Sequence, residues 1–543
     1  MKVLAVIPAR GGSKGIPRKN VRLMHHKPLI YYAIHNAQLC DAITDIAVST
    51  DDEEIAGIAL LYGAKVVERG EALSSDAVTL DPVVYDAVLQ MEKRHQCTYD
   101  AVITLQPTSP LLSAATLQNA IDAFMQDTET DTYISAANAP HLAWSKDENG
   151  YFPLYKERLN RQQLPPNYLE AGAFFITKRQ FVQPNSRMGK RISVFEIPAK
   201  ESTDIDTIND WIVCEQQLQS KKIILRCDGY RQLGLGHVYR CLTLAYNLIG
   251  HSVKFVLHKD SAEGIEKIKA SFFPYAVVGS DEEFFKLLRQ EKPDIVVNDC
   301  LDTEKAYIQT LRTLVPRVVT FEDLGEGSLY TDATVNALYE TKLRRENVFT
   351  GEKYVVLRDE FIYSEPITPK ENAKEVFVMF GGADPLNLTE RVYRLAQRAL
   401  VRHPELVFTF VAGPAYDCDA HGVVSADGIR VIKDAKRVST YMANADLAFT
   451  SQGRTVFELA SMGIPAIVMA QNEREQLHTF AQMENGFINL GLGNAVQDDT
   501  LEKTFEWLLT TYEIRRDMHR LMLQHPLKGN VARVKKIILG ENV

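Results

Sequence analysis

The first 220 residues alternate between short apolar runs and amphipathic stretches, and this alternation limits the possible folds more than any other feature of the chain. Short apolar runs are typical of buried strands, and amphipathic stretches are typical of surface helices. Strands that alternate with helices predict a mostly parallel sheet with helices on both faces. We expect strands at residues 3–7, 46–49, 65–67, 101–105, 132–135 and 173–176, and helices at 29–39, 52–61, 82–93 and 114–125.

A loop rich in glycine and cations follows the first predicted strand, with the sequence Ile-Pro-Ala-Arg-Gly-Gly-Ser-Lys-Gly-Ile-Pro-Arg-Lys-Asn over residues 7–20. Gly11 and Gly12 let the backbone approach a ligand where a Cβ atom would clash. A polyphosphate needs its charge matched at close range, so this loop predicts a polyphosphate site. The spacing is not that of a Walker loop, and a basic solvated loop is the alternative. The loop contains four cations: Arg10, Lys14, Arg18 and Lys19.

Two further polar segments follow predicted strands: Ser-Thr-Asp-Asp at residues 49–52 and Leu-Gln-Pro-Thr-Ser-Pro at residues 105–110. Ligands of parallel sheets bind beyond the carboxyl ends of the strands, so we expect both segments to share one pocket with the glycine-rich loop. Each segment alone could be a turn or a helix cap. Asp51 and Ser113 are the candidates for N-cap residues.

Asp204 and Asp206 flank one apolar residue near the end of this half. In an extended segment both side chains point to the same side. Two carboxylates on one side offer the hard oxygen ligands that Mg²⁺ prefers, with water and phosphate oxygens completing its shell. The alternative is that Asp206 only caps the helix that we expect from Thr207 to about residue 218.

The composition narrows the class of protein. At 543 residues the chain is long enough for about two to four domains, and 45% hydrophobic and 24% charged residues are ordinary for globular proteins. A net charge of −9 argues against a general nucleic-acid partner. The seven cysteines are scattered without a Cys-x-x-Cys pair, which predicts reduced thiols. We find no signal peptide and no run of about 20 apolar residues for a membrane span, so we expect a cytoplasmic protein with no membrane partner.

The pattern starts again near residue 221, where a predicted helix ends and a new strand begins. We expect strands at residues 223–227, 253–257, 295–298 and 318–321, a linker at 364–369, and a further α/β unit with strands at 375–380, 406–412 and 447–450. The glycine-rich loop of the first half does not recur, so the halves are not tandem copies. The predicted domains are residues 1–220, 221–365 and 366–543.

A Gly-x-Gly loop, Gly234 to Gly236, precedes a helix that we expect to begin near His237. A helix N-terminus binds anions, and its dipole favours the neutral, basic form of a histidine in the first turn. This position favours a functional His237 over a structural one. Further along, the backbone N–H groups of residues 453–455 can bind a diphosphate, and Glu458, one turn into the next helix, can bind a ribose diol.

The loop of residues 7–20 resembles the signature of the CMP-sialic acid synthetases, or acylneuraminate cytidylyltransferases, and the resemblance covers residues 2–218. Residues 104–111 resemble the second motif of that family, 161–165 its sugar-side segment, and 204–207 its metal motif. The resemblance implies an enzyme that couples CTP to a nonulosonic acid, such as sialic, legionaminic or pseudaminic acid, and releases pyrophosphate. It also implies a homo-oligomer formed through this domain.

The same resemblance implies roles for individual residues. Arg10 and Lys14 would hold the triphosphate and act in catalysis, together with Gly11 and Gly12 of the loop. Asn20 would hold the nucleotide, with Arg69 and Thr79 as further candidates. Gln106 would face the acceptor sugar, and Asp204 and Asp206 would hold Mg²⁺. Many members carry Asn-Gly-Ala where this chain has Ala171-Gly172-Ala173, which leaves the identity of the acid open.

Residues 222–490 resemble the GT-B architecture, and more closely the UDP-sugar hydrolases of pseudaminic acid synthesis and their relatives in spore-coat polysaccharide biosynthesis. This resemblance implies a hydrolase that needs no metal. His237, after Gly236, would activate water, Thr455 and Glu458 would bind UDP, and Asn472 would be an active-site asparagine. The hydrolases usually carry Asp-x-Tyr where residues 298–302 read Asn-Asp-Cys-Leu-Asp, which is closer to the spore-coat branch.

Together these patterns predict a bifunctional nucleotide-sugar enzyme of the α/β class. A nucleotidyltransferase domain of Rossmann-like type would be followed by a GT-B-like pair of Rossmann-like domains. The first half would act as a cytidylyltransferase and the second as a hydrolase of a UDP-sugar. Two alternatives stay open for the second half, which are a UDP-sugar glycosyltransferase and a non-catalytic module that binds UDP-sugars.

Overall fold

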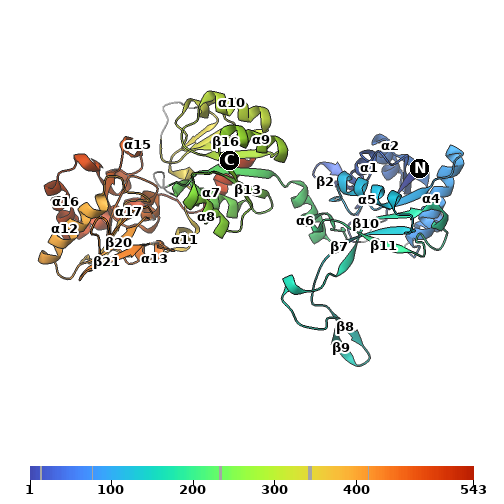
Figure 1. Ribbon diagram of the computed structural model, residues 1–543, viewed down its shortest axis with the longest axis horizontal. Coiled ribbons are helices and arrows are strands. Elements are labelled where there is room, and N and C mark those ends of the chain that lie inside the picture. Colours follow the sequence, from blue (N-terminus) through green and yellow to red (C-terminus); the bar gives the residue numbers. More distant parts are fainter. Residues whose placement is uncertain are drawn as a thin grey trace. The chain divides into compact units, whose positions relative to one another are not determined.

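The computed structural model describes residues 1–12, 15–75, 77–230, 235–339, 345–413, 415–433 and 435–542 (Figure 1). Two compact units make up the chain, Met1–Ser220 and Lys221–Val543. Each unit is built around parallel β-sheet with helices packed on its faces, which confirms the predicted α/β class.

The first unit contains one seven-stranded sheet and two short hairpins. Its strands are β1 (Val3–Pro8), β2 (Leu23–Met24), β3 (Lys27–Pro28), β4 (Asp45–Thr50), β5 (Lys65–Glu68), β6 (Ala101–Leu105), β7 (Thr132–Asn138), β8 (Trp144–Asp147), β9 (Gly150–Pro153), β10 (Tyr168–Lys178) and β11 (Ile192–Glu196). The large sheet has the order β11-β7-β10-β6-β1-β4-β5. Among the described strands of this sheet, β10 alone runs antiparallel to its neighbours. Every strand predicted for this half is present.

Helices cover both faces of this sheet. They are α1 (Leu29–Gln38), α2 (Glu53–Leu61), α3 (Glu71–Ser74), α4 (Leu80–His95), α5 (Ala114–Gln126) and α6 (Ile208–Leu218), with 3-10 turns η1 (Arg161–Gln163), η2 (Arg179–Phe181) and η3 (Ala199–Glu201). Val3, Ala5 and Ile7 of β1 pack with α1, α2 and α5, whereas Leu4 and Val6 pack with α4. Because β1 is buried on both faces, it forms an unbroken apolar run.

The helix caps confirm one prediction and correct two others. Ser113 caps α5 as predicted, by accepting the backbone N–H of Thr116. Asp51 does not cap α2, because the helix begins one residue later and Asp52 accepts its free N–H groups instead. Asp206 does not cap α6 either. Thr207 fills that position in a capping box with Asp210, so the capping alternative for Asp206 is wrong.

The second unit contains two fully parallel sheets. The first has the strands β12 (Lys222–Cys227), β13 (Ser252–His258), β14 (Tyr275–Val278), β15 (Ile295–Asp299), β16 (Arg317–Phe321), β17 (Ala333–Asn336) and β18 (Val348–Thr350). The second has β19 (Glu375–Met379), β20 (Val407–Ala412), β21 (Ile429–Lys433), β22 (Leu447–Thr450), β23 (Ala466–Ala470) and β24 (Phe487–Leu492). Their orders are β14-β13-β12-β15-β16-β17-β18 and β21-β20-β19-β22-β23-β24. In each sheet the order reverses beside the first strand, which is the doubly wound arrangement that binds ligands at this switch point.

Helices of the second unit pack around these sheets. They are α7 (Gly236–Asn247), α8 (Ala262–Ala270), α9 (Asp281–Glu291), α10 (Lys305–Leu314), α11 (Asp359–Tyr363), α12 (Leu388–Arg402), α13 (Ser439–Met442), α14 (Thr455–Met462), α15 (Glu473–Gln476), α16 (Asp498–Thr510), α17 (Tyr512–Met522) and α18 (Asn530–Leu539). The 3-10 turns are η4 (Glu326–Tyr330), η5 (Glu352–Tyr354), η6 (Met483–Asn485) and η7 (Gly493–Ala495).

The final helix, α18, returns to the sheet that opens the second unit. Its apolar side chains Val534 and Ile537 are buried in the same core as Ile223 of β12. The side chain of Arg317 donates to the carbonyl oxygens of Ile537 and Ile538 at the end of the helix, at 2.7 and 2.9 Å. The last residues of the chain therefore complete the first subdomain of this unit, although the sequence pattern places them with the second.

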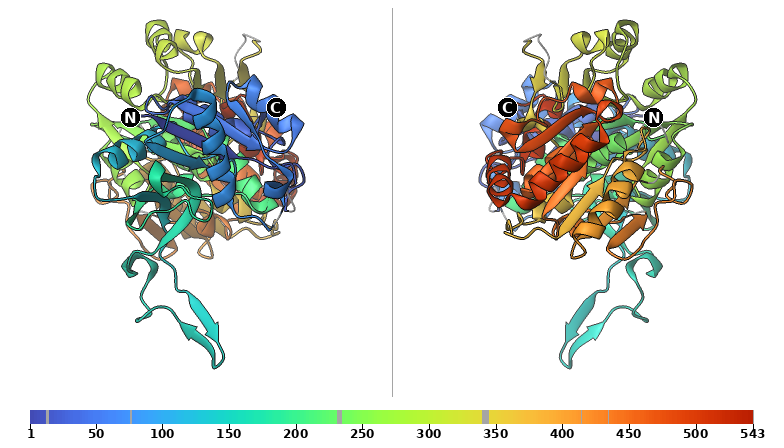
Figure 2. Two further views of the ribbon diagram at one scale, coloured as in Figure 1. Left: turned by 90° about the vertical axis from the view of Figure 1, so that its right-hand side faces the viewer. Right: turned by 90° about the vertical axis from the view of Figure 1, so that its left-hand side faces the viewer.

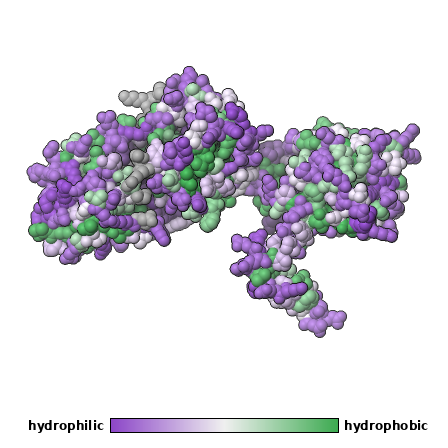
Figure 3. Space-filling model, viewed as in Figure 1, coloured by the Kyte–Doolittle hydropathy of each residue, from purple (hydrophilic) through white to green (hydrophobic). Residues whose placement is uncertain are grey.

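The β8–β9 hairpin extends away from the rest of the first unit (Figure 2). Its side chains Trp144, Tyr151 and Phe152 are exposed, and apolar residues lie among polar ones on its surface (Figure 3). All seven cysteines are free thiols, as predicted. Within the described part of the chain, no helix combines the length and the apolar character that a membrane span requires.

Candidate active sites in the two units

A cavity of 290 Å³ lies in the first unit at the switch point between β1 and β6. The glycine-rich loop, the segment after β6 and the Asp204–Asp206 segment all reach it. The cavity therefore brings together three motifs that lie far apart in the sequence, including Arg10 and Asp206. Its lining residues are Pro8, Arg10, Gly15, Lys19, Asn20, Arg69, Leu80, Gln106, Pro107, Thr108 and Asp206.

Hydrogen bonds hold the described part of the glycine-rich loop in place. The buried side chain of Asn20 donates to the carbonyl oxygen of Arg10 at 3.0 Å. The N–H of Gly11 donates to Asp51 at 3.1 Å, and a Cβ atom on Gly11 would lie 2.5 Å from a carboxylate oxygen of Asp52. Glycine is thus required where the loop passes the start of α2. Gly12 is exposed, and Lys14 lies outside the described residues.

Two other nucleotide-side candidates differ in their placement. Arg69 is buried at the cavity wall, where its guanidinium donates to the backbone oxygen of Ser49 at 2.8 Å. Burial and the nearby Arg10 lower the pKa of Arg69, while Asp51 opposes this shift. Thr79 is exposed at the N-cap position of α4 and makes no capping hydrogen bond. Its neighbour Leu80, rather than Thr79, lines the cavity.

Asp204 and Asp206 differ in burial. The Oδ1 atom of Asp204 is buried and has no hydrogen-bond partner. The hydroxyl oxygens of Thr108 and Ser109 are also buried without a partner. Burial raises the pKa of Asp204, and the charge of Asp206 raises it further. The side chain of Asp206 is 80% exposed and lies 3.8 Å from the Nζ atom of Lys19. Buried oxygens without a partner mark a place where a ligand is expected.

The backbone between the two carboxylates is held from both sides. Lys19 donates to the carbonyl oxygen of Ile205 at 2.5 Å, and the N–H of Ile205 donates to that of Thr108 at 2.9 Å. No group of three His, Cys, Asp or Glu side chains suited to a metal occurs among the described residues. Two carboxylates with an unpartnered oxygen fit Mg²⁺, which takes its remaining ligands from water and phosphate.

Gly172 lies beside both the metal candidate Asp204 and Gln106, the predicted sugar contact. Its φ angle is +65°, in the left-handed region that favours glycine. A Cβ atom here would lie 2.8 Å from Oδ2 of Asp204 and 3.6 Å from Nε2 of Gln106. The backbone N–H of Gln106 also donates to the carbonyl oxygen of Ala173 at 3.1 Å. The segment of residues 171–173 therefore packs directly against the predicted metal ligand and the predicted sugar contact.

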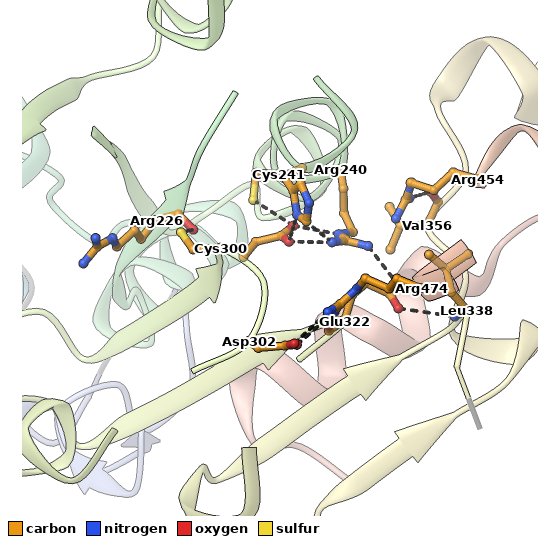
Figure 4. Close-up of polar contacts among 12 residues, drawn as sticks. Arg226, Arg240, Cys241, Cys300, Asp302, Glu322, Leu338, Val356, Arg454 and Arg474 are labelled. Carbon is orange, nitrogen blue, oxygen red and sulfur yellow. Dashed lines mark hydrogen bonds and ion pairs between the residues drawn. The ribbon is translucent and has the colours of Figure 1, made fainter. Parts of the chain in front are cut away.

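In the second unit, a buried ionic cluster lies at the switch point of the first sheet. His237 is the second residue of α7, and its Nδ1 atom lies 2.5 Å from Oδ1 of Asp299 at the end of β15. A carboxylate at Nδ1 keeps the proton there and leaves Nε2 as the basic nitrogen. Arg240 donates to both oxygens of Asp299, at 2.6 and 2.5 Å, and to Glu322 at 3.0 Å. Figure 4 shows Arg240 joined to Glu322 in this cluster.

Asp299 was absent from the predicted site residues. It is fully buried, and although burial opposes ionisation, Arg240 and His237 hold the pKa of Asp299 well below its usual range. Burial raises the pKa of Glu322, against the attraction of Arg240. The signal available in the sequence was a carboxylate at the carboxyl end of a buried strand, next to the strand that precedes the Gly-x-Gly loop. Gly234 of that loop lies outside the described residues.

The predicted UDP-binding residues Thr455 and Glu458 lie on α14, the helix that follows β22 of the second sheet. Thr455 is buried as the first residue of α14, and Glu458, one turn later, accepts from Arg358 at 2.8 Å. Asn472 is the N-cap of α15, where its side chain accepts the N–H of Glu475 at 3.0 Å. This hydrogen bond gives Asn472 a structural role. A Cβ atom on Gly236 would lie 3.7 Å from Cδ of Arg454, so the start of α7 adjoins the start of α14.

Glu475, a second titratable group that we did not predict from the sequence, lies beside Gly453 in the loop before α14. Glu475 accepts the N–H of Gln471 at 2.8 Å, and burial raises the pKa of Glu475 to about 7. Its Oε1 atom lies 3.7 Å from where a Cβ atom of Gly453 would stand. Buried His478 packs nearby with its Nδ1 atom 3.0 Å from the carbonyl oxygen of Gln452.

Comparisons with known proteins cover both units. The family model described as "Cytidylyltransferase" matches residues 4–177. The pseudaminic acid cytidylyltransferase of Campylobacter jejuni is 36% identical over 217 residues, covering 39% of this chain and 93% of that protein.

A Helicobacter pylori protein matches across both units. It is named as a pseudaminic acid cytidylyltransferase and UDP-2,4-diacetamido-2,4,6-trideoxy-beta-L-altropyranose hydrolase. It is 25% identical over 535 residues, or 93% of this chain and 94% of that protein. Among solved structures, MurG of Acinetobacter baumannii aligns with 59% of this chain and 99% of its own, at 17% identity and a TM-score of 0.45.

Proposed function

Because the chain belongs to the cytidylyltransferase family, we propose that its first unit transfers CMP from CTP to a nonulosonic acid and releases pyrophosphate. The observation that carries this proposal is that Arg10, Lys19, Gln106 and Asp206 line the same cavity. The names of the Campylobacter and Helicobacter relatives make pseudaminic acid the first candidate for the acceptor.

The chemistry follows from the placement of charge. The anomeric hydroxyl oxygen of the acid attacks the α-phosphorus, the bond from that phosphorus to the β-phosphate oxygen breaks, and the hydroxyl proton passes to solvent. Catalysis of such a transfer consists mainly of positioning and of neutralising charge on the leaving pyrophosphate. Arg10, Lys19 and the predicted Lys14 supply positive charge on the loop. Asp204 and Asp206 would hold Mg²⁺, which would supply further positive charge when bound.

Pyrophosphate release tests this proposal. The full chain is incubated with CTP, Mg²⁺ and a panel of nonulosonic acids. We expect release with at least one acid, and loss of about 100-fold or more in Asp204→Asn, because one of the two carboxylate ligands loses its charge. Asp122→Asn, on the exposed face of α5, serves as the matched control. Lack of release with every acid, or an Asp204→Asn variant as active as wild type, would contradict the proposal.

For the second unit we propose hydrolysis of a UDP-sugar. The Nε2 atom of His237 would take a proton from water, while Asp299 keeps the imidazole oriented. The full-length match to the Helicobacter protein supports this activity. Mass spectrometry of UDP-diacetamido sugars incubated with the full chain, without any acceptor, tests it. A glycosyltransferase would release UDP only with an acceptor other than water, and a binding module would show no turnover for His237→Ala to remove.

Two further properties belong to the proposal. Seven free thiols fit a reducing compartment, which supports a cytoplasmic location. The exposed Trp144, Tyr151 and Phe152 of the β8–β9 hairpin support a homo-oligomer formed through the first unit. Light scattering of wild type and of a Tyr151→Ser/Phe152→Ser variant tests the second property, because loss of these side chains should lower the measured mass.

A further inference from the structure

Arg474 links the two subdomains of the second unit, the one built on β12–β18 and the one built on β19–β24. It lies in α15, after β23 of the second sheet. Its guanidinium donates to both carboxylate oxygens of Asp302, at 2.7 and 2.9 Å, and to the carbonyl oxygen of Glu322 at 2.6 Å. Asp302 lies in the turn after β15, and Glu322 directly follows β16. Figure 4 shows Arg474 extended toward Asp302, beside Glu322. One side chain of the second subdomain therefore holds two turns of the first.

Both of these turns contain an unfavourable backbone conformation. The φ angle is +67° at Leu301 and +51° at Glu322, in the left-handed region. Residues with a Cβ atom seldom adopt this region, because the Cβ atom crowds the following carbonyl oxygen. Such a conformation persists only where the surroundings enforce it, and it is often found at active sites. Leu301 directly precedes Asp302, so Arg474 contacts each turn at its strained residue or next to it.

The same two turns carry the groups around His237. Asp299, two residues before Leu301, has its Oδ1 atom 2.5 Å from Nδ1 of His237. Glu322 accepts from Arg240 at 3.0 Å, and Arg240 also donates to Asp299. A shift of either turn would move Asp299, directly or through Arg240, and the imidazole with it. A displacement of about 1 Å is enough to slow a reaction about 100-fold.

Further contacts fix the position of Arg474 against the first subdomain. Its Cζ atom lies 5.2 Å from the ring centroid of Tyr339. The backbone of Tyr339 forms an isolated β-bridge with His478, and the N–H of Thr479 donates to the carbonyl oxygen of Leu338 at 3.3 Å. Both terminal nitrogens of the guanidinium donate to protein oxygens. This arrangement favours a role in holding the protein over a role in binding the nucleotide.

We propose that Arg474 is a positioning residue for the reaction of the second unit, because it holds the turns that align Asp299 with His237. This inference rests on the proposed hydrolysis of a UDP-sugar. In that step the water oxygen bonds to the anomeric carbon and its proton passes to Nε2 of His237. The bond from the anomeric carbon to the β-phosphate oxygen breaks, and UDP leaves with the electron pair. The base is aligned only when the subdomain with the predicted UDP-binding residues packs against the subdomain that carries His237.

Turnover and nucleotide binding of the full chain separate this role from others. Arg474→Met removes the hydrogen-bond donors and keeps much of the length of the side chain. We expect its kcat for UDP-sugar hydrolysis to fall about tenfold or more, because the base is misaligned. Its dissociation constant for UDP, measured by calorimetric titration, should stay within about twofold of wild type, because the predicted UDP-binding residues keep their contacts.

Two further variants complete the comparison. Arg474→Lys should have a kcat between those of wild type and Arg474→Met, because a single ammonium group cannot reproduce the planar two-bond contact with Asp302. Arg398→Met is the matched control. Arg398 is an exposed arginine of α12 that pairs with Glu502, far along the chain from both turns. This variant should match wild type in kcat and in UDP binding.

Hydrogen–deuterium exchange of the two turns, residues 299–304 and 321–326, provides a readout that needs no substrate. The N–H of Leu324 donates to Oδ1 of Asp302 at 2.8 Å, so the two turns are also bonded to each other. Exchange in both turns should be faster in Arg474→Met than in wild type and in Arg398→Met, because the strained backbone loses a restraint.

Three results would overturn the inference: a kcat of Arg474→Met within about twofold of wild type, UDP binding that weakens as much as kcat falls, or unchanged exchange in both turns. If wild type hydrolyses no UDP-sugar, the proposed function of the second unit fails. The exchange of the two turns then decides by itself whether Arg474 holds them.

Discussion

Gly172→Ala is the substitution that tests the first site most directly. Gly172 has a φ angle of +65°, a conformation that costs an alanine about 1–2 kcal/mol. The new Cβ atom would stand 2.8 Å from Oδ2 of Asp204, whereas ordinary contacts begin at 3.4 Å. The carboxylate must therefore move by about 0.6 Å. Because its other oxygen is buried, it can move only by shifting its surroundings.

Displacement of a predicted metal ligand should reduce activity more than stability. A misplacement of about 1 Å can cost about 100-fold in rate, so we expect turnover to fall roughly tenfold or more. The Mg²⁺ concentration at half-maximal rate should rise, since Asp204 can no longer be aligned with Asp206. The free energy of unfolding should fall by about 1–3 kcal/mol, combining the cost of the positive φ angle and the contact.

Pyrophosphate release at a series of Mg²⁺ concentrations measures the first effect, and calorimetry of the full chain measures the second. Gly57→Ala is the matched control. Gly57 lies inside α2, and a Cβ atom there meets nothing within 4 Å, so this variant should keep its activity and gain up to about 1 kcal/mol. The reasoning is refuted if Gly172→Ala keeps the turnover and Mg²⁺ dependence of wild type, or if Gly57→Ala is impaired to the same degree.

Three further outcomes follow from the structure. Asp299→Asn should destabilise the second unit by about 3–5 kcal/mol, measured by calorimetry, and lower UDP-sugar hydrolysis about 100-fold or more, since His237 loses the carboxylate that orients it; a variant with unchanged stability would contradict the buried pairing. Burial raises the pKa of Glu475 to about 7 from an ordinary value of 4.5, so the folded state holds more protons than the unfolded state between these values and stability falls as the pH rises through this window. In Glu475→Gln this pH-dependent loss of unfolding free energy, at most roughly 3 kcal/mol, should disappear. If the melting temperatures of wild type and variant change with pH in the same way from pH 5 to 8, the idea is wrong. Thr207→Ala should cost about 1 kcal/mol of stability by opening the capping box with Asp210, whereas Thr207→Ser should restore it.

Much of the fold and part of the first site could be predicted from the sequence. Apolar periodicity operates over a few residues, so the strands and helices of the first unit appear close to the expected ranges. In a parallel sheet the carboxyl ends of neighbouring strands meet at one edge, so the segments after β1 and β6 had to converge. The same reasoning located His237 at the start of a helix beside such an edge. It erred where a single residue decided the outcome, as when Asp52 rather than Asp51 capped α2.

The tertiary structure alone decided which charged groups pair. His237 and Asp299 are 62 positions apart, and Arg358 and Glu458 are 100 apart. No local pattern specifies such partners, because they depend on how complete elements pack and on which carboxylates burial leaves available. The return of α18 to the first subdomain follows the same logic. The local sequence pattern therefore determined the helices, the strands and the sheet edges where ligands bind. Long-range packing determined the chemical environment of each side chain at those edges.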